Sequence, residues 1–64
     1  MKAATILRRL RGEKSQSEVA KDIGITKSSW AMYERGERTP RDQIKVKIAN
    51  YFGETVQYIF FSDE

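Results

Sequence analysis

The sequence predicts an all-α protein, a compact bundle of five short helices spanning residues 1–64 as one domain. Apolar residues recur three or four positions apart, the spacing that gives a helix one buried face. Helix-capping residues and glycines separate these stretches at short intervals. The strict alternation of a half-buried strand is absent. A chain this short builds only one small core, and it has no cysteine with which to form a disulfide.

The first helix is expected from Ala3 to Arg11. Its apolar face consists of Ile6, Leu7 and Leu10, which follow helical spacing. Arg8 and Arg9 fall on other sides, and we interpret both as parts of a solvated helix surface. Gly12 is expected to end the helix, because glycine adopts the left-handed conformation at little cost. The connection that follows is very short, so the first two helices are expected to be neighbours.

A capping box marks the start of the second helix. The Ser15 hydroxyl can accept a hydrogen bond from the Glu18 amide, and the Glu18 side chain can reach back to the Ser15 amide. The inward residues of this helix are Val19, Ala20 and Ile23. Gly24 is expected to end it, which leaves a tight turn before the next capping residue.

Thr26 is a good N-cap for a third helix, expected from Lys27 to about Glu34. Trp30 and Tyr33 lie three positions apart and are expected to point into the core, although aromatic side chains can also stack on nucleic-acid bases. Two helices that cross steeply over a short turn need a small residue where their backbones approach, and Ala20 meets that need.

Two further helices complete the pattern. Thr39 and Pro40 indicate the start of the fourth, expected from Pro40 to about Phe52, with proline at its first position. Its apolar positions are Ile44, Val46, Ile48, Ala49, Tyr51 and Phe52. Gly53 is expected to end it. Thr55 then caps a short fifth helix from Val56 to about Phe60.

The composition argues against several classes of function. The chain has no histidine and no cysteine, and therefore lacks the commonest general base and the commonest metal ligands. We expect no catalytic residues, no metal and no cofactor. No apolar run approaches the roughly 20 residues that span a bilayer. The N-terminal segment carries charge within its apolar stretch and does not look like a signal peptide. We therefore expect a soluble protein of the cytoplasm.

Positive charge is concentrated in the first two thirds of the chain. The formal net charge is +3; residues 1–40 carry nine Lys/Arg and five Asp/Glu, whereas residues 41–64 carry three and four. A basic excess on one part of a small domain suits a polyanionic partner.

The stretch QSEVAKDIGITKSSWAMYER, residues 16–35, resembles the helix-turn-helix of the phage-repressor and Cro-like (Xre-type) regulators, and the likeness covers roughly residues 6–60. It implies a five-helix DNA-binding domain whose helix-turn-helix is formed by the second and third helices. It also implies a transcriptional regulator, a repressor that binds an inverted-repeat operator in double-stranded DNA as a homodimer through the major groove. Such a protein is bacterial or phage-encoded and associates with the nucleoid.

The resemblance also suggests roles for individual residues. Base-reading positions are Lys27, Ser28, Ala31 and Met32; positions facing the DNA backbone are Gln16, Thr26, Ser29, Arg35, Arg38 and Arg41. Glu34 matches an acidic residue that pairs with an arginine of the first helix, for which Arg11 is the first choice and Arg9 the second. Lys45 falls where a leucine is common, so Ile44 and Val46 are expected to take over its packing.

The C-terminal segment, residues 55–61, is the expected dimerisation segment. Val56, Ile59 and Phe60 share one face that can cover the core, whereas Tyr58 and Phe61 point elsewhere. Exposed aromatic residues on a small domain suggest an interface. We therefore assign Tyr58, Ile59 and Phe61 to a homodimer interface; the alternative is local packing of Phe61 on Phe52 or Tyr51.

A second class of function stays open from the sequence alone. The helix-turn-helix could serve as a scaffold while the aromatic segment binds a protein partner. An enzyme is a distant third alternative because no acid–base pair is evident. Nothing in the sequence marks a small-molecule effector site.

Overall fold

A computed structural model describes residues 2–62, and this part of the chain contains five α-helices and no strand. Along the chain the helices are α1 (Lys2–Arg11), α2 (Gln16–Ile23), α3 (Lys27–Arg35), α4 (Asp42–Phe52) and α5 (Val56–Phe60). The all-α prediction is confirmed, and the helix ends agree with the expected ones to within one residue except at the start of α4.

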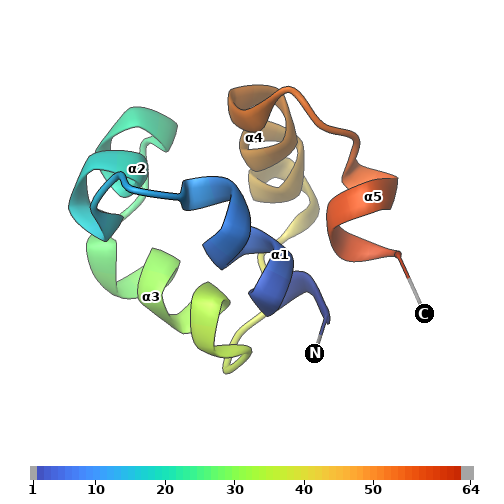
Figure 1. Cartoon of the computed structure of the whole chain (residues 1–64), viewed down its shortest axis with the longest axis horizontal. Helices are drawn as coiled ribbons and strands as arrows, with labels where there is room; N and C mark the ends of the chain where they lie inside the picture. The colour runs from blue at the N-terminus through green and yellow to red at the C-terminus, as the bar shows by residue number, and fades with distance from the viewer. Residues whose placement is uncertain (1, 63–64) are drawn as a thin grey trace.

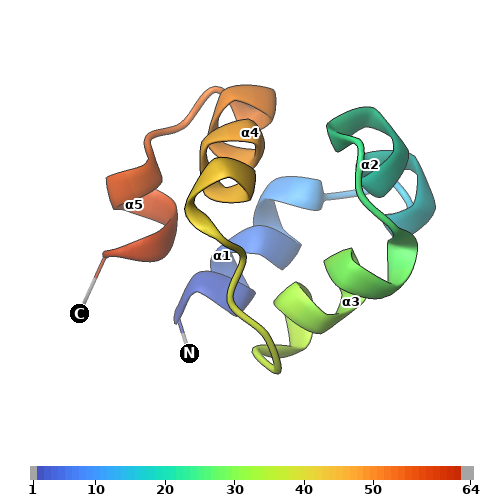
Figure 2. The same ribbon diagram turned by 180° about the vertical axis from the view of Figure 1, so that it is seen from behind.

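Helix α1 lies at the centre of the arrangement. It contacts α3 on one side and α5 on the other, while α2 packs against α3 and α4 packs against α5. Figures 1 and 2 show α2 and α3 together at one end of the molecule and α4 with α5 at the other, with α1 between them. The helix-turn-helix pair is therefore held by contacts with α1, and less extensively with α4.

All five helices contribute to the core. Its buried members are Ile6, Leu7, Val19, Ala20, Ile23, Trp30, Tyr33, Ile48, Ala49 and Ile59. Most of these positions follow the helical spacing that the sequence predicts. Trp30 is fully buried, so it packs in the core and is not available for stacking on a base.

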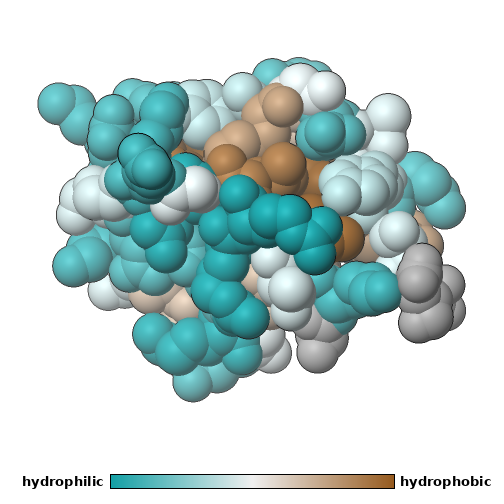
Figure 3. All heavy atoms as spheres, in the orientation of Figure 1, coloured by the Kyte–Doolittle hydropathy of each residue, from teal (hydrophilic) through white to brown (hydrophobic). Residues whose placement is uncertain are grey.

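On one face of the molecule, apolar side chains that pack against the core are partly exposed. Figure 3 shows a hydrophobic area over the junction of α1 and α4, surrounded by a mostly hydrophilic surface. Partly buried apolar residues that pack against the core include Leu10, Phe52 and Val56. A domain of this size has too little polar surface to cover all of its apolar groups, so such areas are ordinary.

The start of α4 differs from the sequence prediction. The helix begins at Asp42 with Arg41 at the N-cap, whereas Pro40 was expected at its first position. Pro40 is buried and lies outside any helix, in the connection between α3 and α4. The proline is therefore buried ahead of the helix and does not form its first turn.

Packing along α4 also departs from the expectation at two neighbouring positions. Val46, expected to widen the apolar face, is 49% exposed. Lys45 takes the inward side instead, and its side chain is only 14% exposed. Its Nζ lies 4.9 Å from the ring centre of Phe61 and 5.7 Å from that of Phe60. The long methylene stem can pack against apolar neighbours while the charged end stays near water and the ring faces.

Candidate nucleic-acid interface

Local capping positions the two helices of the motif. The Ser15 Oγ accepts a hydrogen bond from the Glu18 amide at 3.0 Å, and the Thr26 Oγ1 accepts one from the Ser29 amide at 3.0 Å. Both predicted N-caps are confirmed, but the returning bond of the expected capping box, from the Ser15 amide to the Glu18 carboxylate, is not formed. Each cap satisfies one of the amides that a helix start leaves without an intrahelical partner.

The turn between α2 and α3 depends on a glycine. Gly24 has a φ of 95°, a left-handed conformation that side-chain-bearing residues rarely adopt. Its amide donates to the Ala20 carbonyl at 2.8 Å, and the Ile25 amide donates to the same carbonyl at 2.9 Å. Ala20 itself is buried where α2 meets α3. A larger side chain there would force the two helices apart.

The inner face of α3 contains a buried charge. Glu34 is only 2% exposed, yet both of its carboxylate oxygens are fully used. Arg11 Nε donates to Oε2 at 2.5 Å, and Arg11 Nη2 donates to Oε1 at 3.1 Å. Gln16 Nε2 donates to Oε1 at 3.0 Å, and the indole Nε1 of Trp30 donates to Oε2. The Arg11–Glu34 ion pair suggested by the resemblance is therefore present, with two further donors.

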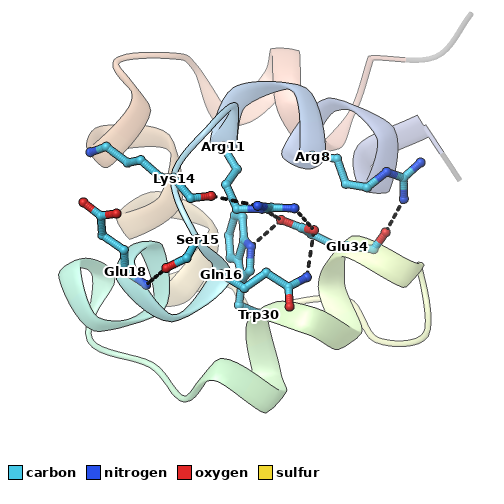
Figure 4. Close-up of polar contacts among 8 residues, drawn as sticks. All are labelled: Arg8, Arg11, Lys14, Ser15, Gln16, Glu18, Trp30 and Glu34. Atoms are coloured by element: carbon cyan, nitrogen blue, oxygen red, sulfur yellow. Dashed lines mark hydrogen bonds and ion pairs between the residues drawn. The ribbon is translucent and has the colours of Figure 1, made fainter.

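These contacts come from three helices, as Figure 4 shows: Arg11 from α1, Gln16 from α2, and Trp30 from α3 itself. Burial alone raises the pKa of Glu34. The hydrogen bonds from Arg11, Gln16 and Trp30, together with the Arg11 charge, outweigh that effect and leave its pKa below the ordinary value. Glu34 is therefore ionised at neutral pH, and its charge is compensated.

A fourth contact was missed by the sequence analysis. Arg8 Nη1 donates to the backbone carbonyl of Glu34 at 2.6 Å, so the interpretation of Arg8 as purely solvated surface is wrong. The signal was the separation of three residues between Arg8 and Arg11, which places both on one side of α1. Two arginines of α1 therefore donate hydrogen bonds to Glu34, in the last turn of α3.

The outer face of α3 has the opposite character. Lys27 and Ser28 are exposed, and Ala31 and Met32 are half-buried. These four residues and Arg35 line one shallow hollow on the surface of α3. All the base-reading positions proposed from the sequence thus share one side of one helix, and Arg35, assigned to the DNA backbone, lies beside them. Small side chains at Ser28 and Ala31 leave room for another molecule to approach closely.

A second hollow lies between α3 and the start of α4. Its lining includes the backbone-facing candidates Thr26, Ser29, Arg38 and Arg41, and also Thr39 and Gln43, which the sequence analysis did not select. Neither Arg38 nor Arg41 has a carboxylate partner among residues 2–62. Uncompensated cations beside hydroxyl and amide groups are a suitable environment for phosphate oxygens.

Two other candidates for backbone contact already have protein partners. Gln16 lies at the start of α2 and donates to Glu34, outside the second hollow. Arg35 forms an exposed ion pair with Glu37, 3.0 Å between Nε and Oε2. This pair lowers the pKa of Glu37 and raises that of Arg35 through their hydrogen bond. An exposed pair is weak and exchanges readily for another anion.

One of the three expected dimer residues is buried in the core. Phe61 is 55% exposed and Tyr58 is partly exposed, but Ile59 is 1% exposed and belongs to the core. The assignment of Ile59 to an interface is therefore wrong, since its side chain fills the space between α5 and the rest of the bundle. The other inward residues of α5, Val56 and Phe60, are only partly buried.

A polar relay outside these surfaces ties the loop after α1 to α2 and α4. Lys14 Nζ donates to the Tyr51 hydroxyl at 2.8 Å, and that hydroxyl donates to Asp22 Oδ2 at 2.7 Å. Within residues 2–62, no group of acidic residues is arranged to hold a metal ion. No helix of this part of the chain is long and apolar enough to cross a membrane.

A protein-family model described as helix-turn-helix matches residues 7–59, which is most of the chain. It covers both hollows, the Glu34 contacts and nearly all of α5. None of the curated proteins and none of the solved structures compared with the chain matches it.

Proposed function

Because the chain belongs to the family of Xre- and phage-repressor-like helix-turn-helix regulators, which bind DNA and are not enzymes, we propose that it recognises a specific DNA operator through α3. The observation that carries this proposal is the outer face of α3. Its base-reading candidates lie together in one hollow, while the inner face of the same helix is fully engaged in the core.

An α-helix fits the major groove of B-DNA, where each base pair presents a distinct pattern of donors and acceptors. Lys27 lies in the first turn of α3, and its ammonium group can donate to guanine O6 or N7. Met32 and Ala31 provide apolar surface for a thymine methyl group. A cation in the first turn of a helix is disfavoured by the helix dipole, so a DNA partner compensates a local cost at Lys27.

The second hollow supplies the contacts that position α3. Thr26, Ser29, Arg38 and Arg41 lie on one side of the reading residues and would face phosphates of the DNA backbone. Gln16 and Arg35 would contribute further backbone contacts once Arg35 exchanges Glu37 for a phosphate. With a reading surface of only four residues, backbone contacts and DNA shape contribute much of the affinity and part of the specificity.

Dimerisation and repression are part of the same proposal. Tyr58 and Phe61 supply exposed aromatic surface on α5 and just after it, which supports an interface with a second copy. Two α3 helices in a two-fold dimer would enter successive major grooves about 34 Å apart, so the operator would be an inverted repeat. A repressor would act by occupying such a site on the bacterial or phage genome, within the nucleoid.

Selection of bound duplexes from a random pool tests this proposal most directly. A specific regulator is expected to enrich an inverted repeat, and its affinity is expected to fall with salt at a slope of about −0.9 per phosphate neutralised. Weak binding that is indifferent to sequence would reject the proposal. Sedimentation at micromolar concentration, with and without the selected duplex, tests the dimer; a protein that stays monomeric on DNA would reject that part.

A second candidate function rests on the same exposed aromatic residues. Tyr58 and Phe61 could bind a protein partner while the helix-turn-helix serves as a scaffold. Reversal of charge at Lys27 and Arg38 separates the two. The double substitution Lys27→Glu and Arg38→Glu is expected to abolish binding by a DNA regulator, whereas it would leave a protein-interaction module almost unaffected.

A further inference from the structure

Two neighbouring arginines of α1 differ in what they contact. Arg8 donates to the Glu34 carbonyl in the last turn of α3, whereas Arg9 makes no hydrogen bond or ion pair with another described residue. Carbonyl groups in the last turn of a helix lack intrahelical partners, and the negative end of the helix dipole lies there. Arg8 therefore supplies both a hydrogen-bond donor and a favourable charge to the end of α3.

Gln16 makes the corresponding contact from α2. Its Nε2 donates to Glu34 Oε1, while in Figure 4 its amide oxygen points away from the carboxylate. Gln16 is a half-buried neutral side chain, and it is not one of the two charged partners of the Arg11–Glu34 ion pair. What its hydrogen bond adds is a direct connection between the start of α2 and the last turn of α3.

Both contacts are made at Glu34, at the opposite end of α3 from Lys27, the cationic residue proposed to read bases. Lys27 and Arg35 lie at opposite ends of α3, about 12 Å apart at about 1.5 Å of rise per residue. A tilt of about 10° about the last turn would move the first turn by about 2 Å, which is enough to break a hydrogen bond to a base edge. The tip of the reading helix is therefore sensitive to what holds its other end.

We infer that Arg8 and Gln16 are positioning residues for base reading: they clamp the last turn of α3 to α1 and α2, and thereby set the angle at which α3 enters the groove. Loss of either contact lowers discrimination between DNA sequences more than it lowers affinity for DNA in general. This inference rests on the proposed function. It differs from the assignment of Gln16 to a phosphate, because a backbone contact supports all sequences equally.

The chain offers a matched control for each residue. Arg8→Met and Arg9→Met remove the same charge from adjacent positions of α1, but only the first removes a contact with α3. Gln16→Met and Asn50→Met each replace a side-chain amide, at the start of α2 and on the exposed surface of α4. Affinities of these four variants and the unsubstituted protein are measured for the best selected duplex, single-mismatch duplexes and an unrelated duplex. All measurements are made well below each melting temperature.

For Arg8→Met and Gln16→Met, the ratio of affinities for the best and the unrelated duplex is expected to fall about tenfold, or about 1.4 kcal/mol. Arg9→Met and Asn50→Met are expected to keep that ratio. The two arginine variants are expected to share one salt slope, because they lose the same charge. Emission of Trp30, the only tryptophan, reports in the free protein whether the surroundings of Glu34 have loosened.

An unchanged ratio in both Arg8→Met and Gln16→Met would overturn the inference, even if their melting temperatures fall. If Gln16→Met lost affinity equally for every duplex, Gln16 would act as a phosphate contact and not as a positioning residue. Failure of the proposed function is recognised separately, since the unsubstituted protein would then prefer no duplex at all.

Discussion

The two faces of α3, a helix of nine residues, differ in role: the inner face packs in the core, and the outer face is proposed to bind DNA. The inner face places Trp30, Tyr33 and Glu34 in the core, where every polar atom of Glu34 has a donor. On the outer face, the side chains of Lys27, Ser28 and Met32 make no hydrogen bond or ion pair with residues 2–62. Buried groups whose hydrogen bonds are all formed hold the helix in place, whereas exposed side chains without partners are available to bind another molecule. A change on either face is therefore expected to affect mainly one property, either stability or DNA binding.

The largest effect on stability is expected at Trp30. Trp30→Ala removes the most buried large side chain and a donor to Glu34, with an expected loss of about 3–5 kcal/mol of unfolding free energy. That is comparable to the whole stability of a small domain, so the variant should be largely unfolded. Urea denaturation followed by circular dichroism measures it.

The control is Ser28→Ala, two residues away on the outer face, for which a change within about 0.5 kcal/mol is expected. If both variants unfolded at the same urea concentration, the division of α3 into two faces would be wrong.

Protonation of Glu34, on the inner face of α3, is expected to lower the unfolding free energy in acid. Its pKa is lower in the folded protein than the ordinary value of 4.5, so ionisation of Glu34 stabilises the fold above that value. This contribution is constant above about pH 5 and is lost as the pH falls through the lower folded pKa. Unfolding free energies measured between pH 7 and pH 3 should follow this curve.

Glu37 provides the comparison, because its pKa is also lowered but it is exposed beside Arg35. Glu37→Gln is expected to retain the loss of stability in acid, whereas Glu34→Gln is expected to be less stable at neutral pH and to lack most of that loss. The opposite pattern would place the acid sensitivity on the surface.

On the outer face, Lys27→Ala is expected to weaken binding to the selected duplex on the order of tenfold to a hundredfold, the loss typical of one specific base contact. Its unfolding free energy should stay the same or rise slightly, because the substitution removes a cation from the first turn of α3. Fluorescence anisotropy with labelled DNA measures the affinity. Lys21→Ala on α2 is the matched control, and equal losses in the two variants would argue for general charge attraction alone.

The smallest effect is expected where the two faces meet, at the N-cap of α3. Thr26→Ala removes the acceptor for the Ser29 amide and is expected to cost about 1 kcal/mol of unfolding free energy. Thr26→Ser keeps the hydroxyl and should recover most of it. A thermal melt of both variants is sufficient, and an unaltered melting temperature in Thr26→Ala would mean that the cap is dispensable.

Much of the fold follows from interactions within a few residues, which is why the sequence predicts it. Helical spacing identified the inward sides of α1, α2 and α3, and the Ser15, Thr26 and Thr55 caps identified the starts of three helices. The same local reasoning failed at Pro40, where a proline suited to a first helical turn is buried outside the helix. It also failed at Lys45, which lies beside the rings of Phe60 and Phe61, residues distant in the chain.

By itself, the sequence determined the five helices, the motif between Gln16 and Arg35, and the single set of residues on the outer face of α3. The family resemblance suggested Arg11 as a partner of Glu34, but only the tertiary structure decided that Arg8 and Gln16 also hold it, since they are separated from it by 26 and 18 residues. Periodicity and capping act over about four residues and can be recognised in a linear pattern. Contacts between helices depend on crossing angles, and those exist only once the core has packed.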